Sequence, residues 1–149
     1  MKIHIKRNEL NYNGEKYSVE VPMKVEGTCD CIDQVNYTIK NNEYLDSFDC
    51  HNVKVFAYLI AKYMETDIDY DWEENPIYTD YEAENYIPIN YCPICGDKIE
   101  IIVDEVVDLS DIIAPLIEEL KPLEIKQPSV ANYKRRNEIE NKIRKLMFT

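Results

Sequence analysis

The sequence lacks long hydrophobic runs. No apolar stretch among its 149 residues approaches the ~20 residues that a membrane-spanning helix needs. The N-terminal segment MKIHIKRNEL also lacks the apolar core of a secretion signal. These absences predict a cytoplasmic protein, and in that reducing compartment its five cysteines are typical of metal sites or free thiols.

Basic residues are also in short supply. Lysine and arginine number 17 against 29 acidic residues, which gives a formal net charge of −12. Such a surface repels phosphate, so direct nucleic-acid binding and binding to anionic membranes are both disfavoured for the molecule as a whole. The charge is uneven: residues 43–84 contain twelve acidic and two basic residues, whereas residues 125–149 contain seven basic and two acidic residues.

Histidine and glycine are scarce, which limits the possible catalytic chemistry. Neither His4 nor His51 is followed by the glutamate that zinc deaminases place two residues later. Gly14, Gly27 and Gly96 each fall at a predicted turn, so none is left for a phosphate-binding loop or a dinucleotide-binding fingerprint. Because each catalytic pattern lacks a required residue, we predict that the protein is not an enzyme.

Hydrophobic periodicity predicts the following elements. Alternating apolar and β-branched residues predict strands over residues 2–10, 16–25, 34–40, 86–91 and 98–107. The first two strands are expected to form one hairpin, and the last two another. Apolar residues at helical spacing predict helices over residues 52–65, from Ser110 or Asp111 to Pro122, and over 130–147, the last capped by Ser129. The acidic stretch 66–91, interrupted by Pro76 and Pro88, is interpreted as an ordered loop or irregular edge.

Together these elements predict an α+β fold. It would consist of a small antiparallel sheet or hairpins, an interrupted zinc-ribbon-like site and about three helices. A zinc-stabilised domain over residues 1–124 would be followed by a basic amphipathic C-terminal helix within residues 125–149. That helix could pack on the parent domain or bind a partner.

The strongest chemical motif is the segment NYCPICGDKI, residues 90–99. Two residues between Cys92 and Cys95 bring both sulfurs to one side of a tight turn, which Pro93 stiffens and Gly96 allows the chain to leave. The segment resembles the zinc knuckle of zinc-ribbon proteins, whose usual pattern is CPxCG. The resemblance implies a bound Zn²⁺, but it extends over these residues only and implies no partner or activity.

A closed structural zinc site needs four ligands, and Cys29 and Cys31 are the best second pair. The sixty residues between the pairs, 32–91, exceed the roughly 15–20 of a compact zinc site. We therefore predict a ribbon interrupted by a long insertion. Cys50 and His51 lie within that insertion, and either of them could replace one member of the Cys29 and Cys31 pair.

The acidic centre contains a second candidate site, in which acids alternate with apolar and aromatic residues. In an extended conformation, at ~3.3 Å per residue, alternate carboxylates would lie about 6.6 Å apart on one face, a spacing similar to that of successive phosphates. The candidate partner-binding residues are Asp67, Asp69, Tyr70, Asp71, Trp72, Glu73 and Glu74. The alternative interpretation is a solvated acidic loop whose aromatic side chains pack inward.

These observations favour a non-enzymatic, zinc-stabilised protein-binding module. We expect an inhibitor or adaptor that presents an acidic, nucleic-acid-mimicking face to a basic protein partner. The abundance of Asn, Ile, Lys and Tyr is typical of small proteins from AT-rich bacteria and their phages. Two alternatives stay open: a nucleic-acid-linked regulator that uses the zinc hairpin or the basic C-terminal helix, and a small metal-dependent enzyme.

Overall fold

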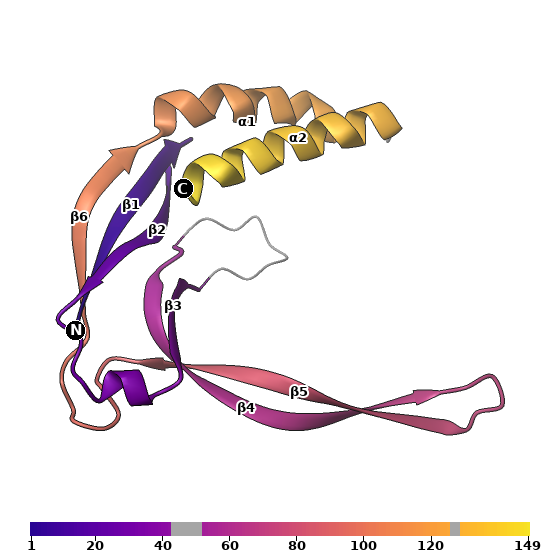
Figure 1. The fold of residues 1–149 in the computed structure, drawn as a ribbon. Helices are drawn as coiled ribbons and strands as arrows, with labels where there is room; N and C mark the ends of the chain where they lie inside the picture. The colour runs from indigo at the N-terminus through magenta and orange to yellow at the C-terminus, as the bar shows by residue number, and fades with distance from the viewer. Residues whose placement is uncertain (43–51, 126–128) are drawn as a thin grey trace.

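The described part of the chain folds into two three-stranded sheets and two helices. The computed structural model describes residues 1–42, 52–125 and 129–149. In chain order the elements are β1 (Lys2–Tyr12), β2 (Glu15–Glu26), the 3-10 turn η1 (Ile32–Gln34), β3 (Tyr37–Asn41), β4 (Val55–Tyr70), β5 (Pro76–Ile89), β6 (Glu100–Asp108), α1 (Ser110–Ile125) and α2 (Val130–Met147). The helices extend from one end of the molecule and the long β4–β5 hairpin from the other, which gives the outline of an open C (Figure 1).

The first sheet has the strand order β2-β1-β6. Strands β1 and β2 form the predicted antiparallel hairpin, and Asn13 and Gly14 supply the positive φ angles of its turn. Strand β6 pairs in parallel with β1. The predicted hairpin between residues 86–91 and 98–107 is therefore wrong, although an isolated bridge joins Tyr91 to Lys98.

The second sheet, β3-β4-β5, overturns the predicted fold class. Residues 52–65, predicted as a helix, lie mostly in β4, and the acidic stretch 66–91, predicted as a loop, completes the β4–β5 hairpin. The described residues are mostly sheet (51%), so the predicted α+β fold class is incorrect; the two helices found among them differ only slightly from the three expected. Buried Val53, Val55 and Ala57 alternate with less buried neighbours, as strand residues do.

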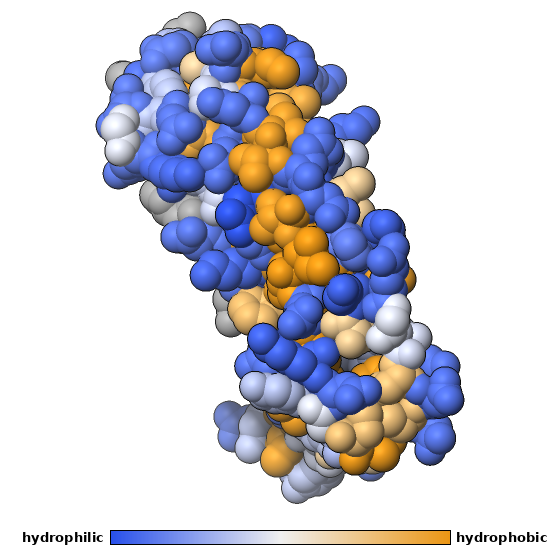
Figure 2. Space-filling model, turned by 90° about the vertical axis from the view of Figure 1, so that its left-hand side faces the viewer, coloured by the Kyte–Doolittle hydropathy of each residue, from blue (hydrophilic) through white to orange (hydrophobic). Residues whose placement is uncertain are grey.

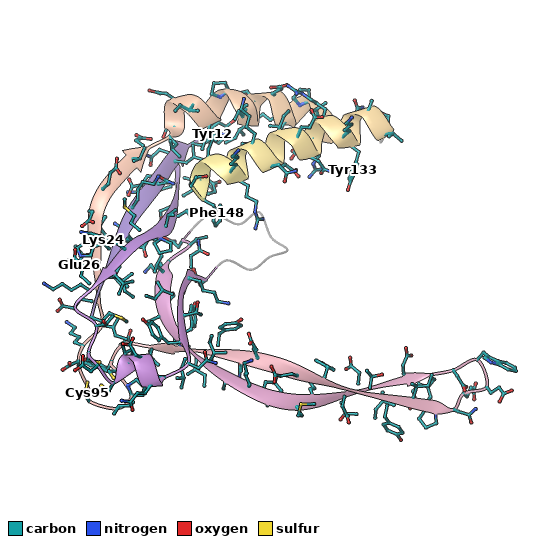
Figure 3. The ribbon with its side chains drawn as sticks, viewed as in Figure 1. Tyr12, Lys24, Glu26, Cys95, Tyr133 and Phe148 are labelled. Atoms are coloured by element: carbon teal, nitrogen blue, oxygen red, sulfur yellow. The ribbon has the colours of Figure 1, made fainter. Side chains whose placement is uncertain are left out.

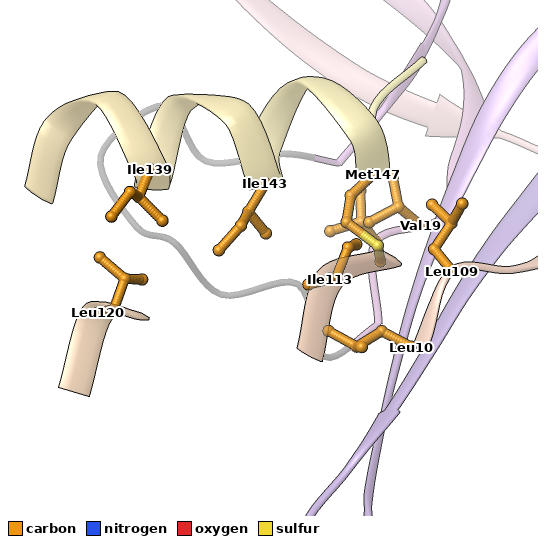
Figure 4. Close-up of a cluster of buried hydrophobic side chains, with 9 residues drawn as sticks. Leu10, Val19, Leu109, Ile113, Leu120, Ile139, Ile143 and Met147 are labelled. Atoms are coloured by element: carbon orange, nitrogen blue, oxygen red, sulfur yellow. The ribbon is translucent and has the colours of Figure 1, made fainter. Parts of the chain in front are cut away.

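Two hydrophobic clusters hold the elements together. In the first, α1 and α2 pack over the end of the first sheet that includes Leu10 and Val19 (Figure 4). In the second, Ile3 and Ile5 of β1 pack against Val55 of β4 and its neighbours. Strand β1 thus contributes to both clusters, one on each of its faces.

Local hydrogen bonds explain where the two helices begin. Asp108 accepts hydrogen bonds from the amide and hydroxyl groups of Ser110, the first residue of α1. Ser129 caps α2 as predicted, because its hydroxyl accepts a hydrogen bond from the amide of Asn132 at 3.2 Å. Helix α1 continues past Pro122, where the sequence predicted its end. Among the described residues, no helix has the length and apolar character needed to cross a membrane.

Helix α2 is packed against the body through an apolar stripe. Ile139, Ile143 and Met147 are buried in the first cluster. The side chain of Asn8 donates a hydrogen bond to the carbonyl oxygen of Met147 at 2.7 Å. The division into a domain of residues 1–124 and a C-terminal helix within 125–149 stays a prediction, and truncation is its direct test.

Candidate functional site

The four predicted cysteine ligands lie together at the end of the first sheet remote from the helices. Cys29 and Cys31 are in the loop that follows β2, and Cys92 and Cys95 are in the loop between β5 and β6. Their sulfur atoms all lie within 4.8 Å of one another. Figure 3 shows Cys95 beside the η1 turn. The structure thus brings together two pairs that are widely separated in sequence, whereas Cys50 and His51 lie outside the described residues.

Backbone hydrogen bonds shape both loops around the sulfurs. In the second loop the amide of Cys92 donates to the carbonyl of Asp97 at 2.8 Å, and the amide of Gly96 donates to the carbonyl of Cys92 at 2.9 Å. Gly96 has φ of +80°, the left-handed conformation that the knuckle pattern requires. In the first loop the amide of Ile32 donates to the carbonyl of Cys29 at 3.0 Å, which starts the η1 turn.

The distances between the sulfurs suit a tetrahedral metal ion. The Sγ atom of Cys31 lies 3.3 Å from that of Cys29 and 3.5 Å from that of Cys92. A Zn–S bond of ~2.3 Å in tetrahedral geometry separates neighbouring sulfurs by about 3.8 Å. Both distances are slightly shorter than this value, and all four sulfurs lie within 4.8 Å of one another, so small shifts would bring them to the spacing of a four-thiolate zinc shell.

The electrostatics of the cluster favour a cation. Hydrogen bonds from the amides of Cys95 and Ile94 lower the pKa of the Cys92 thiol to about 6. Hydrogen bonds with Cys95 and Cys29 raise the pKa of Cys31, because a thiol proton shared between sulfurs is hard to remove. Four thiolates this close repel one another, and a divalent cation at the centre offsets that repulsion. The donor set therefore fits a metal ion that prefers sulfur ligands.

A second feature is the outer part of the β4–β5 hairpin, residues 62–86, which we call the acidic arm. It contains nine acidic residues and one basic residue. All of its side chains are exposed except those of Asp71 and Ala83, which are partly buried. Cross-strand contacts keep it ordered: Lys62 lies 2.9 Å from Glu82, and the Thr66 hydroxyl donates to Asp80 at 2.6 Å.

Within strand β4, the arm alternates acids with apolar residues, as an extended chain should. Asp67 and Asp69 are two residues apart in β4 and share one face, while Ile68 and Tyr70 lie on the other. Ile68 pairs with Tyr78 in the β4–β5 register, so apolar side chains from both strands share that second face. The acids of β5, Asp80, Glu82 and Glu84, lie on it as well. Ile68 is 56% exposed, and Tyr70 and Tyr78 are each 65% exposed. The alternative interpretation, a loop whose aromatic side chains pack inward, is therefore wrong for these residues.

At the end of the arm the chain turns, so the extended pattern stops at Tyr70. Asp71 accepts hydrogen bonds from the amides of Glu73 and Asn75, at 2.8 and 2.9 Å, and its pKa is lowered by the bonds from Asn75. Glu74 has φ of +62° within this turn, and Trp72 at the tip is 89% exposed. Asp71 therefore holds the turn together instead of continuing the row of carboxylates.

Sequence reasoning missed the acids of the second strand, Asp80, Glu82 and Glu84. They follow from the hairpin, which was not predicted. The available signal was Asp71 followed by Asn75, two turn-forming residues between runs rich in tyrosine and isoleucine.

The basic C-terminal helix forms ion pairs with its own chain. Arg135 pairs with Glu119 of α1 and lies 3.4 Å from Glu138. Arg136 pairs with Glu140 at 2.8 Å. Part of the positive charge that would attract a nucleic acid is thus neutralised within the molecule.

Comparison with protein-family models, with curated proteins and with solved structures gave no match for this chain. The resemblance to zinc knuckles therefore stays confined to residues 90–99, and functional inference depends on the geometry of the cysteine cluster and the acidic arm.

Proposed function

We propose that this protein is a non-enzymatic, zinc-stabilised protein-binding module, an inhibitor or adaptor whose acidic arm occupies the nucleic-acid-binding groove of a basic protein partner. The observation that carries the proposal is the arm itself, an ordered two-stranded ribbon that is exposed on both faces and contains nine acidic residues and one basic residue.

The arm lowers the stability of the isolated molecule. A two-stranded ribbon without a covering layer is marginally stable in water, and its crowded carboxylates repel one another. Exposed apolar side chains such as Ile68, Tyr70 and Trp72 gain no burial in the free protein. A basic partner would screen the acids and bury the aromatics, and buried aromatic side chains contribute strongly to protein interfaces.

The role of the proposed zinc is to fix the base of the arm. Strand β5 ends at Ile89, and Cys92 follows three residues later. Zinc bound to the four cysteines would tie this end of the arm to the loop after β2. A shell of four thiolates leaves no open position for a substrate or a reactive water, which supports a structural role for the ion.

Reversing charge on the arm should slow partner binding without affecting the fold. In a protein with Asp67→Lys and Asp69→Lys, we expect partner association to slow by at least tenfold, because electrostatic steering contributes 10–10³-fold to on-rates. Asp71 is left unchanged because it holds the turn. The control, Asp111→Lys with Glu124→Lys on α1, changes the net charge equally at exposed sites outside the arm.

The experiment begins with tagged full-length protein as bait in nuclease-treated lysate, followed by kinetic measurements on the purified partner. A partner that is basic, lost by the arm variant, retained by the α1 control and displaced by duplex DNA would support the proposal. A partner that binds the arm variant as well as the original, or that DNA does not displace, would contradict it.

Trp72 should anchor the partner. It is the only tryptophan in the chain and stands at the tip of the arm. We expect Trp72→Ala to weaken partner binding by at least tenfold, within the range of aromatic hot spots, and to change the free energy of unfolding by no more than about 0.5 kcal/mol. Tryptophan fluorescence gives a second readout, because burial in the complex should shift its emission to shorter wavelength. Unchanged emission on partner binding would remove Trp72 from the interface.

A further inference from the structure

Strand β6 forms an unpaired edge of the first sheet. In the order β2-β1-β6 it has β1 on one side and no strand on the other among the described residues. It extends over nine residues, Glu100–Asp108. Strand β6 lies on the left-hand side of Figure 1, and Figure 2 shows that side of the molecule. A band of hydrophobic residues runs along it (Figure 2). An exposed hydrophobic edge strand offers free backbone hydrogen-bonding groups to another chain.

One face of β6 carries a continuous apolar row. Ile101 and Val103 line a cavity of about 290 Å³ between the two sheets. A register shift against β1 follows Val103, so the alternation resumes one residue later. Val107 packs against the first hydrophobic cluster on the opposite face, which puts Val106 on the same face as Ile101 and Val103. These three side chains of the row are 40%, 37% and 55% exposed, in chain order.

The other exposed side chains of β6 are acidic, whereas Ile102 and Val107 are partly buried. Its charged residues are Glu100, Asp104, Glu105 and Asp108, and it has no basic residue. The Asp104 carboxylate lies 2.8 Å from Nδ1 of His4, and Glu100 lies 3.7 Å from the Lys98 ammonium group. An incoming strand would therefore meet apolar side chains on one face and carboxylates along the remainder of the edge.

We propose that the β6 edge docks an extended segment of a partner protein in which apolar and basic residues alternate. The segment would add a strand to the first sheet through main-chain hydrogen bonds, and its apolar side chains would lie along the Ile101–Val106 row. The cavity next to this row is bordered by Arg7 and Glu20, which form an ion pair at 2.8 Å. It would accept an apolar side chain, while basic side chains would face the carboxylates.

Charge argues against a second copy of the chain as the occupant. Antiparallel pairing of β6 with its own copy would bring acidic strands together, and like charges on neighbouring strands destabilise a sheet. The inference is independent of the acidic arm, because it concerns a different sheet and a different kind of contact.

The test uses the peptide acetyl-KVRVKVRV-amide as the probe and the full-length protein at physiological salt. We expect binding that is at least tenfold tighter than that of acetyl-KKRRVVVV-amide, which has the same charge without alternation. Val106→Lys should weaken binding of the alternating peptide by at least tenfold. The control Val130→Lys, at a position 87% exposed at the start of α2, should stay within twofold of the original. Hydrogen exchange should slow at the amides of β6 when the alternating peptide binds.

Several results would overturn the inference. They are the absence of binding, equal binding of the two peptides, unchanged binding to Val106→Lys, or protection confined to the acidic arm. A dimer of the full-length protein that Val106→Lys dissociates would assign the edge to a second copy instead. The Asp67→Lys, Asp69→Lys variant should still bind the alternating peptide, so a failure of the arm proposal and a failure at β6 can be distinguished.

Discussion

Deletion of residues 129–149 should unfold the first hydrophobic cluster. The deletion removes Ile139, Ile143 and Met147, which are 2%, 1% and 0% exposed, and it leaves the Asn8 side chain without its acceptor at Met147. Truncating one such side chain to alanine typically costs about 2–5 kcal/mol, and a whole domain is stable by only about 5–15 kcal/mol. We therefore expect the truncated protein to lose its cooperative thermal transition, measured by circular dichroism.

A point variant tests the same packing without removing the helix. We expect Ile143→Ala to lower the free energy of unfolding by about 2–5 kcal/mol, because it leaves a cavity beside Leu120 and its neighbours. The control Tyr133→Ala, at a position 68% exposed on the same helix, should change it by no more than about 0.5 kcal/mol. A truncated protein that melts like the original would show instead that residues 125–149 are an appendage to domain 1–124.

Sequence patterns predicted the elements whose signal is local. The β1–β2 hairpin follows from two alternating runs around Asn13 and Gly14, and α2 follows from its Ser129 cap and its apolar spacing. Local patterns do not determine which strands pair with one another. Strand β6 pairs with β1, nearly 100 positions away in sequence. Ile3 and Ile5 of β1 are buried by a second layer, the β4 residues Val55 and Ala57.

The β4–β5 hairpin shows why periodicity failed in the acidic centre. Phe56, Leu59, Ile60 and Tyr63 fit helical spacing, yet they belong to a ribbon whose outer part is buried on neither face. Such a ribbon needs no strict alternation of apolar and polar residues, so the usual signal of a strand is absent. Pro76 and Pro88 also suggested a loop, although proline is tolerated at the first residue of a strand and on an edge strand.

The cysteine cluster was predictable because thiol chemistry limits the alternatives. Spacing identified Cys92 and Cys95 as a knuckle, and Cys29 and Cys31 were the best remaining pair. Their approach depends on the pairing of β1 with β6 and on the packing between the sheets, neither of which the sequence predicted. Residues 66–91 were predicted as a loop, so the extended conformation required for evenly spaced carboxylates was only a condition. Asp67, Asp69 and Tyr70 meet that condition in β4, whereas Asp71 belongs to a turn.

Removing zinc should destabilise the protein more than any single exposed substitution. Zinc would link Cys31 to Cys92 across 61 positions in sequence. In the chain-entropy model for a cross-link, closing a loop of that length contributes about 4 kcal/mol. For a chain of this size, that loss corresponds to a fall of about 8–16 °C in Tm. We expect the reduced, purified protein to contain one zinc ion per chain by mass spectrometry of the metal, and a strong chelator to lower its Tm by this amount.

Variants of single cysteines identify the ligands. Cys29→Ser and Cys92→Ser should each lose stoichiometric zinc and melt like the chelated protein, because three thiolates hold the ion much more weakly than four. Cys50→Ser is the matched control and should keep both its zinc and its Tm. Loss of zinc from Cys50→Ser with retention in Cys29→Ser would move the fourth ligand into the insertion. A fully reduced protein that contains no metal and melts identically with and without chelator would show that the cluster is four buried or partly exposed thiols, and the base of the acidic arm would then depend on packing between the sheets alone.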